Sequence, residues 1–157
     1  EMFAADLAEN RGLLTSLKKI AGEGMPVYAE CGGLMFLCRS LTDLEGKEHT
    51  MSSIFKAKVE MTGKLQALGY IEAKTTQDNI LTQKGARTRG HVFHFSHITE
   101  CDHEEFAYVL DKDRGIAHSL DGMVEDNCLA SYTHLHFGTD PKLAVNFVNK
   151  CRSYSRS

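Results

Sequence analysis

The feature that most constrains this chain is a cysteine set between a short strand-forming run and an apolar helix-forming run. Residues 26–29 (Pro-Val-Tyr-Ala) are β-prone and have glycines nearby on both sides, whereas residues 34–38 (Leu-Met-Phe-Leu-Cys) are typical of a buried helix. Residues 30–33 (Glu-Cys-Gly-Gly) join the two runs. This order predicts a strand, a sharp turn and a helix, with Cys31 on the turn.

The surroundings of Cys31 are those of a nucleophile elbow. Such a turn strains the backbone of the nucleophile and brings together the residues two positions before and after it, where Ala29 and Gly33 are suitably small. The start of a helix places backbone N–H groups beside the sulfur, which predicts a lowered thiol pKa. The N–H of Gly32 could then stabilise an oxyanion. A buried structural cysteine is the alternative that this pattern leaves open.

A thiolate nucleophile needs a base to deprotonate it and an acid for the leaving group, and histidine is the usual choice. Of eight histidines, His134 and His136 lie at the end of a late β-prone run, where a sheet can deliver residues to the rim that carries Cys31. In a regular strand both would point to the same face. Spacing does not choose between them, and a structural role is the alternative for each.

The rest of the chain predicts one α/β domain with a mixed sheet. A helical pattern runs over residues 3–21, and Asp140-Pro141 is typical of the start of a last helix that extends to about residue 154. The β-prone segments fall at residues 57–62, 68–74, 90–98, 106–110 and 128–135. Their close spacing favours antiparallel pairs after an initial βα unit.

Composition excludes several classes of protein. The chain has 157 residues, is 42% hydrophobic and carries a net charge of −3 without a basic stripe, so neither disorder nor nucleic-acid binding is expected. No apolar run approaches the roughly 20 residues that would span a bilayer, so no membrane partner is expected. Five cysteines form an odd set without a Cys-x-x-Cys pair, which favours reduced thiols and a cytoplasmic location.

Three further histidines raise the question of a metal site. In a strand over residues 90–98, His91 and His97 would point one way and His94 the other, so they are unsuited to bind one ion together. We expect no metal here. Cys38 follows Cys31 by about two helical turns, and we expect it to pack in the core.

Four stretches of the sequence, in order, resemble the amidotransferase domain of cobyrinate a,c-diamide synthases. These are residues 28–35 (Tyr-Ala-Glu-Cys-Gly-Gly-Leu-Met), 68–70 (Leu-Gly-Tyr), 89–96 (Arg-Gly-His-Val-Phe-His-Phe-Ser) and 131–137 (Ser-Tyr-Thr-His-Leu-His-Phe). They span nearly the whole chain, and the first is highly specific. The family is a branch of the class I glutamine amidotransferases.

The resemblance implies an α/β fold with a mixed sheet flanked by helices, in which Cys31 attacks the glutamine amide and forms a thioester. His134 matches the family's catalytic histidine. Ammonia would pass to a synthetase domain of the same longer chain, which uses ATP and Mg²⁺ to activate tetrapyrrole carboxylates for amidation. The implied acceptor is cobyrinate, in cobalamin biosynthesis. The alternative acceptor is nickel-sirohydrochlorin, in the coenzyme F430 pathway.

The sequence departs from the family pattern in three places. Many class I amidotransferases have a glutamate two residues after the catalytic histidine, but here that residue is His136, so we expect a dyad of Cys31 and His134 and keep His136 as a secondary candidate. Val92 stands where a glutamate is expected. The opening strands and the loop with the second oxyanion donor would precede residue 1. Residues 1–157 would then be a partial glutaminase domain, weakly active alone or, alternatively, a non-catalytic docking module.

Overall fold

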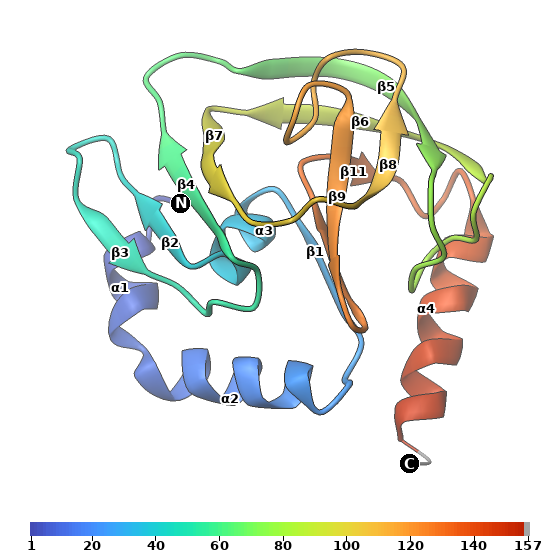
Figure 1. The fold of residues 1–157 in the computed structure, drawn as a ribbon, viewed down its shortest axis with the longest axis horizontal. Helices are drawn as coiled ribbons and strands as arrows, with labels where there is room; N and C mark the ends of the chain where they lie inside the picture. Colours follow the sequence, from blue (N-terminus) through green and yellow to red (C-terminus); the bar gives the residue numbers. More distant parts are fainter. Residues whose placement is uncertain (156–157) are drawn as a thin grey trace.

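The computed structural model describes residues 1–155, which form two β-sheets with four helices around them (Figure 1). The helices are α1 (Ala4–Glu9), α2 (Arg11–Gly22), α3 (Gly32–Leu37) and α4 (Pro141–Tyr154). The strands are β1 (Val27–Glu30), β2 (Ser40–Thr42), β3 (Glu48–Thr50), β4 (Ala57–Met61), β5 (Ala67–Thr75), β6 (Arg87–His94), β7 (Ser96–Cys101), β8 (Phe106–Leu110), β9 (Leu120–Glu125), β10 (Cys128–Ser131) and β11 (His134–Leu135). The predicted α/β class with a mixed sheet flanked by helices is confirmed.

The larger sheet has seven strands in the order β1-β10-β9-β8-β5-β6-β11. β1 and β10 are parallel, and the other pairs are antiparallel. The two edge strands nevertheless meet, because the Glu30 carboxylate at the end of β1 accepts a hydrogen bond of 2.8 Å from the backbone N–H of Leu135 in β11. The sheet therefore curls, and its edges come together beside Cys31.

The smaller sheet, with the order β3-β2-β4-β7, shows where the predicted strand over residues 90–98 was wrong. This run is two strands, since β6 belongs to the larger sheet and β7 to the smaller. The chain changes sheets at Phe95, whose carbonyl accepts a hydrogen bond from Thr62, and Ser96 then pairs with Met61 of β4. The strands β2 and β3 were not predicted, because three residues are too few to show an alternating pattern; β9 was also missed.

The predicted helix over residues 3–21 is two helices, α1 and α2. Asn10 separates them with ψ at 67°, outside the helical range, and its side chain accepts a hydrogen bond of 3.1 Å from the N–H of Leu13. Asparagine favours this capping position because its carbonyl oxygen replaces a missing helical partner. The apolar residues keep a helical spacing across Asn10, so the sequence pattern did not reveal the break.

The predicted strand over residues 128–135 is also two strands, because β10 and β11 occupy different positions in the larger sheet. The last helix is confirmed. Asp140 caps α4 by accepting a hydrogen bond of 3.1 Å from the N–H of Lys142, and Pro141 is the first helical residue.

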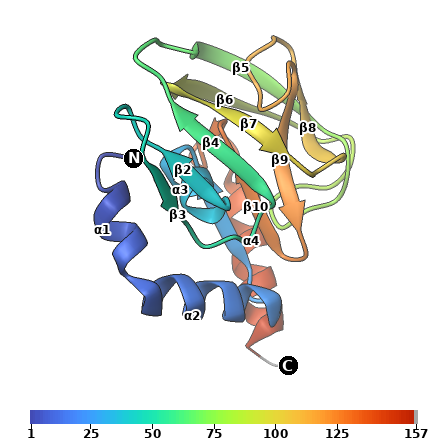
Figure 2. The ribbon, with the colours of Figure 1, turned by 60° about the vertical axis from the view of Figure 1, so that its left-hand side comes forward.

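The core has two parts, one on each face of the larger sheet. The first surrounds α3, which contacts β1 and β10 of the larger sheet and β2 of the smaller; Figure 2 shows α3 close to β2. The second includes Leu129 of β10 and Leu143 of α4. Cys38 is fully buried in the first part, as predicted, and burial raises its pKa to about 12. Among residues 1–155, no helix is long and apolar enough to cross a membrane.

Candidate active site

The turn at Cys31 has the predicted elbow geometry. It lies between the last residue of β1 and the first residue of α3, with φ at 50° and ψ at −106°. A residue with a side chain in this region costs about 1–3 kcal/mol of backbone strain. A Cβ on Gly33 would lie 3.2 Å from the Cβ of Ala29, so both positions must be small.

Hydrogen bonds on both sides fix the backbone of Cys31. Its N–H donates to the carbonyl of Ser131 in β10 over 2.9 Å, and its carbonyl accepts from the N–H of Met35 over 3.0 Å. The thiol donates to the carbonyl of Phe93 over a distance of 3.7 Å. The nucleophile candidate is therefore tied to β10, α3 and β6 at once.

Cys31 and His134 line the same cavity, whose volume is about 470 Å³. Its other walls are mostly apolar and come from residues far apart in the sequence: Glu1, Met2, Met35, Leu44, Met61, Thr62, Gly63, Phe93, His94 and Phe95. A cavity of this size with few polar groups is suited to a small substrate.

The thiol pKa differs from the prediction. Burial raises the pKa of Cys31 above its ordinary value of 9.0, and the nearby Glu1 carboxylate raises it further, whereas a hydrogen bond from Gly32 lowers it. The predicted lowering is wrong, because α3 has only six residues and the sulfur is partly enclosed. A thiol with a raised pKa needs a neighbouring proton acceptor in order to form the thiolate.

His134 is positioned by the pairing of β11 with β6, in which it lies opposite His91. The two imidazoles stack with their centres 4.8 Å apart and their planes at 12°. Gly90 makes this approach possible, since a Cβ there would collide with the carbonyl oxygen of His134. This explains why glycine precedes His91.

The carboxylate of Glu30 contacts His134 from the opposite edge of the sheet. Its Oε2 lies 3.2 Å from Nδ1 of His134, while its Oε1 accepts from the N–H of Leu135 and from the hydroxyl of Tyr28. This contact was not predicted, because the family pattern places a carboxylate at position 136. The sequence feature that could have pointed to Glu30 is its place directly before Cys31, at the end of a predicted strand.

A second carboxylate, Asp121 of β9, fixes the two residues that precede His134. It is fully buried and accepts from the N–H of Tyr132 (3.1 Å) and from the N–H (2.9 Å) and hydroxyl (2.6 Å) of Thr133. Burial raises the pKa of Asp121, although the hydrogen bonds from Thr133 act to lower it. No sequence motif pointed to this residue.

The secondary candidate His136 lies outside this arrangement. β11 ends at Leu135, and His136 is exposed in a turn in which its carbonyl accepts from the N–H and hydroxyl of Thr139. It does not belong to the described residues that line the Cys31 cavity. The expectation that both histidines share a strand face is therefore wrong.

The remaining histidines of the motif are dispersed. His94 is buried against Tyr132, and its Nδ1 lies 2.8 Å from the carbonyl of Ser96; burial lowers its pKa. His97 lies on β7, in the other sheet from His91 and His94. Over residues 1–155, no three His, Cys, Asp or Glu side chains are grouped to bind a metal ion.

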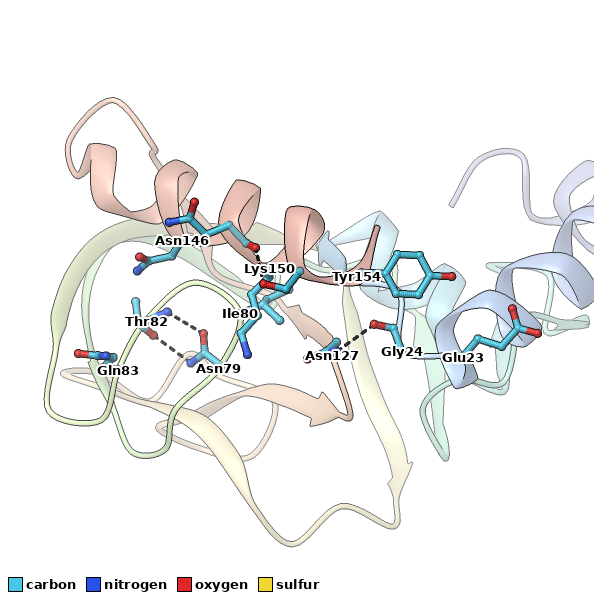
Figure 3. A pocket seen from close by; sticks show the side chains of 12 residues that line it. Glu23, Gly24, Asn79, Ile80, Thr82, Gln83, Asn127, Asn146, Lys150 and Tyr154 are labelled. Carbon is cyan, nitrogen blue, oxygen red and sulfur yellow. Dashed lines mark hydrogen bonds between the residues drawn. The ribbon is translucent and has the colours of Figure 1, made fainter. Parts of the chain in front are cut away.

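A larger hollow of about 560 Å³ lies along α4, away from Cys31 (Figure 3). The described residues that line it are mostly amides and other polar groups: Glu23, Gly24, Asn79, Ile80, Thr82, Gln83, Asn127, Asn146, Asn149, Lys150, Ser153 and Tyr154. None of these lining residues is a cysteine or histidine, whereas Cys31 and His134 line the smaller cavity.

Curated relatives match nearly all of this chain but only part of their own length. The cobyrinate a,c-diamide synthase of Caldanaerobacter subterraneus subsp. tengcongensis is 41% identical over 156 residues, which cover 99% of this chain and 34% of that protein. The protein of the same name from Methanothermobacter thermautotrophicus is 39% identical over 148 residues, which cover 94% of this chain and 32% of that protein. The chain thus spans about a third of the length of these relatives.

Solved structures share the fold at low sequence identity. PurLQS from Thermotoga maritima aligns with a TM-score of 0.62 at 14% identity, over 97% of this chain and 71% of that one. A glutamine amidotransferase aligns with a TM-score of 0.62 at 17% identity, over 94% of this chain and 72% of that chain. The family model for the CobB/CobQ-like glutamine amidotransferase domain matches residues 1–142. With its elbow cysteine and this match over most of its length, the chain belongs to the CobB/CobQ-like glutamine amidotransferase domain family.

Proposed function

We propose that this domain hydrolyses glutamine and supplies the ammonia to an a,c-diamide synthase reaction. The observation that carries the proposal is that a strained cysteine and a histidine with a carboxylate partner line one cavity of about 470 Å³. A nucleophile, a base and a group that orients the base form the usual arrangement for acyl transfer through a covalent intermediate.

In this proposal, the Cys31 thiol transfers its proton to His134 as the sulfur attacks the amide carbon of glutamine and a C–S bond forms. The N–H of Gly32 donates to the developing oxyanion. His134 then returns the proton to the leaving nitrogen, the C–N bond breaks, and ammonia departs. Water, deprotonated by His134, hydrolyses the thioester to glutamate and restores the thiol.

The names of the relatives support a proposal for the acceptor and the partner domain. Because those relatives are named cobyrinate a,c-diamide synthases, we favour a cobyrinate-type tetrapyrrole dicarboxylate over nickel-sirohydrochlorin. A synthetase domain of the same polypeptide, using ATP and Mg²⁺, would activate the carboxylates, since this chain spans about a third of the relatives. All five cysteines are unpaired, which supports a cytoplasmic location.

The test is a pair of assays on the protein that includes its synthetase portion. Cys31→Ser should abolish glutamine-dependent amidation while amidation with added ammonium continues. Cys151→Ser, on α4, is the matched control and should preserve both activities. Loss of both activities in Cys31→Ser would contradict the proposal. Parallel assays with cobyrinate and nickel-sirohydrochlorin identify the acceptor.

We further propose that residues 1–157 alone turn over slowly. The partly enclosed thiol of Cys31 supports this, because it donates to the carbonyl of Phe93 over 3.7 Å and burial raises its pKa, and both favour the thiol over the reactive thiolate. The alternative, that residues 1–157 form a docking module without catalysis, predicts no glutamate release from these residues alone. Rapid glutamate release by residues 1–157 would contradict both views.

A further inference from the structure

We propose that Glu30 is the positioning residue of His134, in the place of the glutamate that many class I amidotransferases have two residues after the histidine. This inference rests on the proposed glutaminase function. It assigns a role to the residue immediately before the nucleophile, so that one dipeptide would supply both the sulfur and the carboxylate that orients the base.

The two oxygens of Glu30 have different partners. Oε1 accepts the N–H of Leu135 over 2.8 Å and the hydroxyl of Tyr28, which fixes the orientation of the carboxylate. Oε2 is thereby directed at Nδ1 of His134, 3.2 Å away. The side chains of Glu30 and His134 are 25% and 29% exposed, so this pair is partly shielded from water.

This contact determines which nitrogen of His134 is available. A carboxylate accepts hydrogen bonds, so it favours the neutral tautomer with the proton on Nδ1. Nε2 then carries the lone pair that can take the thiol proton of Cys31. The same carboxylate stabilises the imidazolium after proton transfer, the role of the buried acid in other nucleophile-base-acid sites.

The topology explains how Glu30 can act without being at position 136. Glu30 ends β1, and His134 begins β11, at the opposite edge of the seven-stranded sheet. The curl of the sheet brings these edges together. Successive residues in a strand point in opposite directions, so Glu30 can contact β11 while the turn directs Cys31 into the cavity. Glu30 does not belong to the described residues that line that cavity.

A purely structural role is the competing explanation, because Glu30 also joins the sheet edges through Leu135. Two substitutions in the protein with its synthetase portion separate the roles. Glu30→Gln preserves the shape of the side chain, but its NH₂ group can face Nδ1 and favour the other tautomer. Glu30→Asp preserves the charge and shortens the reach. A positioning role predicts that Gln lowers kcat more than Asp does, whereas a structural role predicts the reverse.

We expect Glu30→Gln to lower kcat for glutamine hydrolysis by up to about 10⁴-fold, with little change in KM, by analogy with neutralisation of the acid in serine protease triads. Glu72→Gln is the matched control, since Glu72 on β5 pairs with Arg87 and is remote from His134 in the sheet. It should leave kcat unchanged. A Gln variant that retains full kcat, with an Asp variant that loses it, would overturn the inference.

The tautomer can be measured without any activity. Long-range ¹H–¹⁵N NMR of ¹⁵N-histidine-labelled protein, at about pH 8.5 where imidazole is normally neutral, reports which nitrogen carries the proton, and His134→Gln assigns the signal. We expect Nδ1–H in the unsubstituted protein and a shift toward Nε2–H in Glu30→Gln. The same tautomer in both proteins would overturn the inference. Absence of glutaminase activity in the unsubstituted protein would instead contradict the proposed function.

Discussion

The candidate site has two halves, the elbow (residues 29–33) and the arm, which we define as residues 132–135 together with Asp121. Different kinds of contact form the two halves. The elbow depends on neighbours in the sequence, since Ala29, Cys31 and Gly33 fall within five residues. The arm depends on contacts between distant residues: Glu30 reaches His134 across 104 positions, and Asp121 reaches Thr133 across 12. A nucleophile can thus be recognised from a short motif, whereas the machinery that orients its base cannot.

The two halves also differ in their energetic cost. The elbow contains backbone strain, shown by the positive φ of Cys31. The arm contains buried polar groups, such as Asp121, which accepts hydrogen bonds from Tyr132 and Thr133. We therefore expect substitutions in the arm to remove hydrogen-bond partners of buried groups and so to destabilise the fold. Some substitutions in the elbow should instead relieve backbone strain and stabilise it.

Within the arm, the largest effect on glutamine hydrolysis should come from His134. His134→Gln should lower kcat for glutamine hydrolysis roughly 10²- to 10⁴-fold, the usual contribution of a general acid–base. His136→Gln, two residues away and exposed, is the matched control and should change kcat little. Steady-state glutaminase assays of the two variants show which histidine acts as the base. A larger loss in His136→Gln would transfer the base role to that residue.

The next effect concerns Asp121, which fixes the residues before His134. Asp121→Asn should lower the free energy of unfolding by about 2 kcal/mol, because the amide NH₂ cannot accept the hydrogen bonds that the carboxylate accepts and a buried donor loses its partner. Urea denaturation measures this. Glu125→Gln, exposed near the end of the same strand, should have no such effect. Equal stability of the Asn variant would show that the arm does not depend on this carboxylate.

The pH dependence of stability gives a sharper test of Asp121. Because burial raises its pKa above the ordinary value of 3.8, the folded protein binds more protons than the unfolded chain above that pH. The contribution of Asp121 to the free energy of unfolding is therefore complete below pH 3.8, and it decreases as the pH rises through the pKa that Asp121 has in the folded protein. The stability difference between the unsubstituted protein and Asp121→Asn should therefore narrow with rising pH. A widening difference would mean that the pKa is lowered.

A smaller steric effect is expected at the elbow. Gly33→Val should lower the free energy of unfolding by about 1–3 kcal/mol, because even a Cβ there would lie 3.2 Å from the Cβ of Ala29. The control is Gly22→Val at the end of α2, where a Cβ would meet no atom within 4 Å. Thermal and urea denaturation compare the two. Similar losses in both would indicate a helix-propensity effect rather than crowding.

The smallest effect has the opposite sign. Cys31→Gly should raise the free energy of unfolding by about 1 kcal/mol, because glycine relieves the strain at φ 50° while losing some chain entropy on folding. Cys31→Ala retains a Cβ and should not gain stability. Urea denaturation of the two variants measures the strain directly. If Cys31→Gly were less stable than Cys31→Ala, the elbow would not be strained.

Features that depend on residues close together in the chain could be predicted from the amino-acid sequence. The strand–turn–helix at Cys31, the need for small residues on either side of it, and the Asp140 cap of α4 all follow from local backbone sterics and hydrogen bonding. The mixed α/β class followed from the order of the β-prone and helical segments. Each of these could be predicted because the residues responsible are within a few positions of one another.

The tertiary fold set the features that depend on contacts between residues far apart in the chain. It divided the runs at residues 90–98 and 128–135 between different strands, because partners elsewhere in the chain, and not hydrophobic pattern, determine where a strand ends. It raised the pKa of Cys31, since burial outweighed the hydrogen bond from Gly32. It also brought Glu30 to His134, because only the curl of the sheet makes its two edges neighbours, and no spacing along the chain encodes that closure.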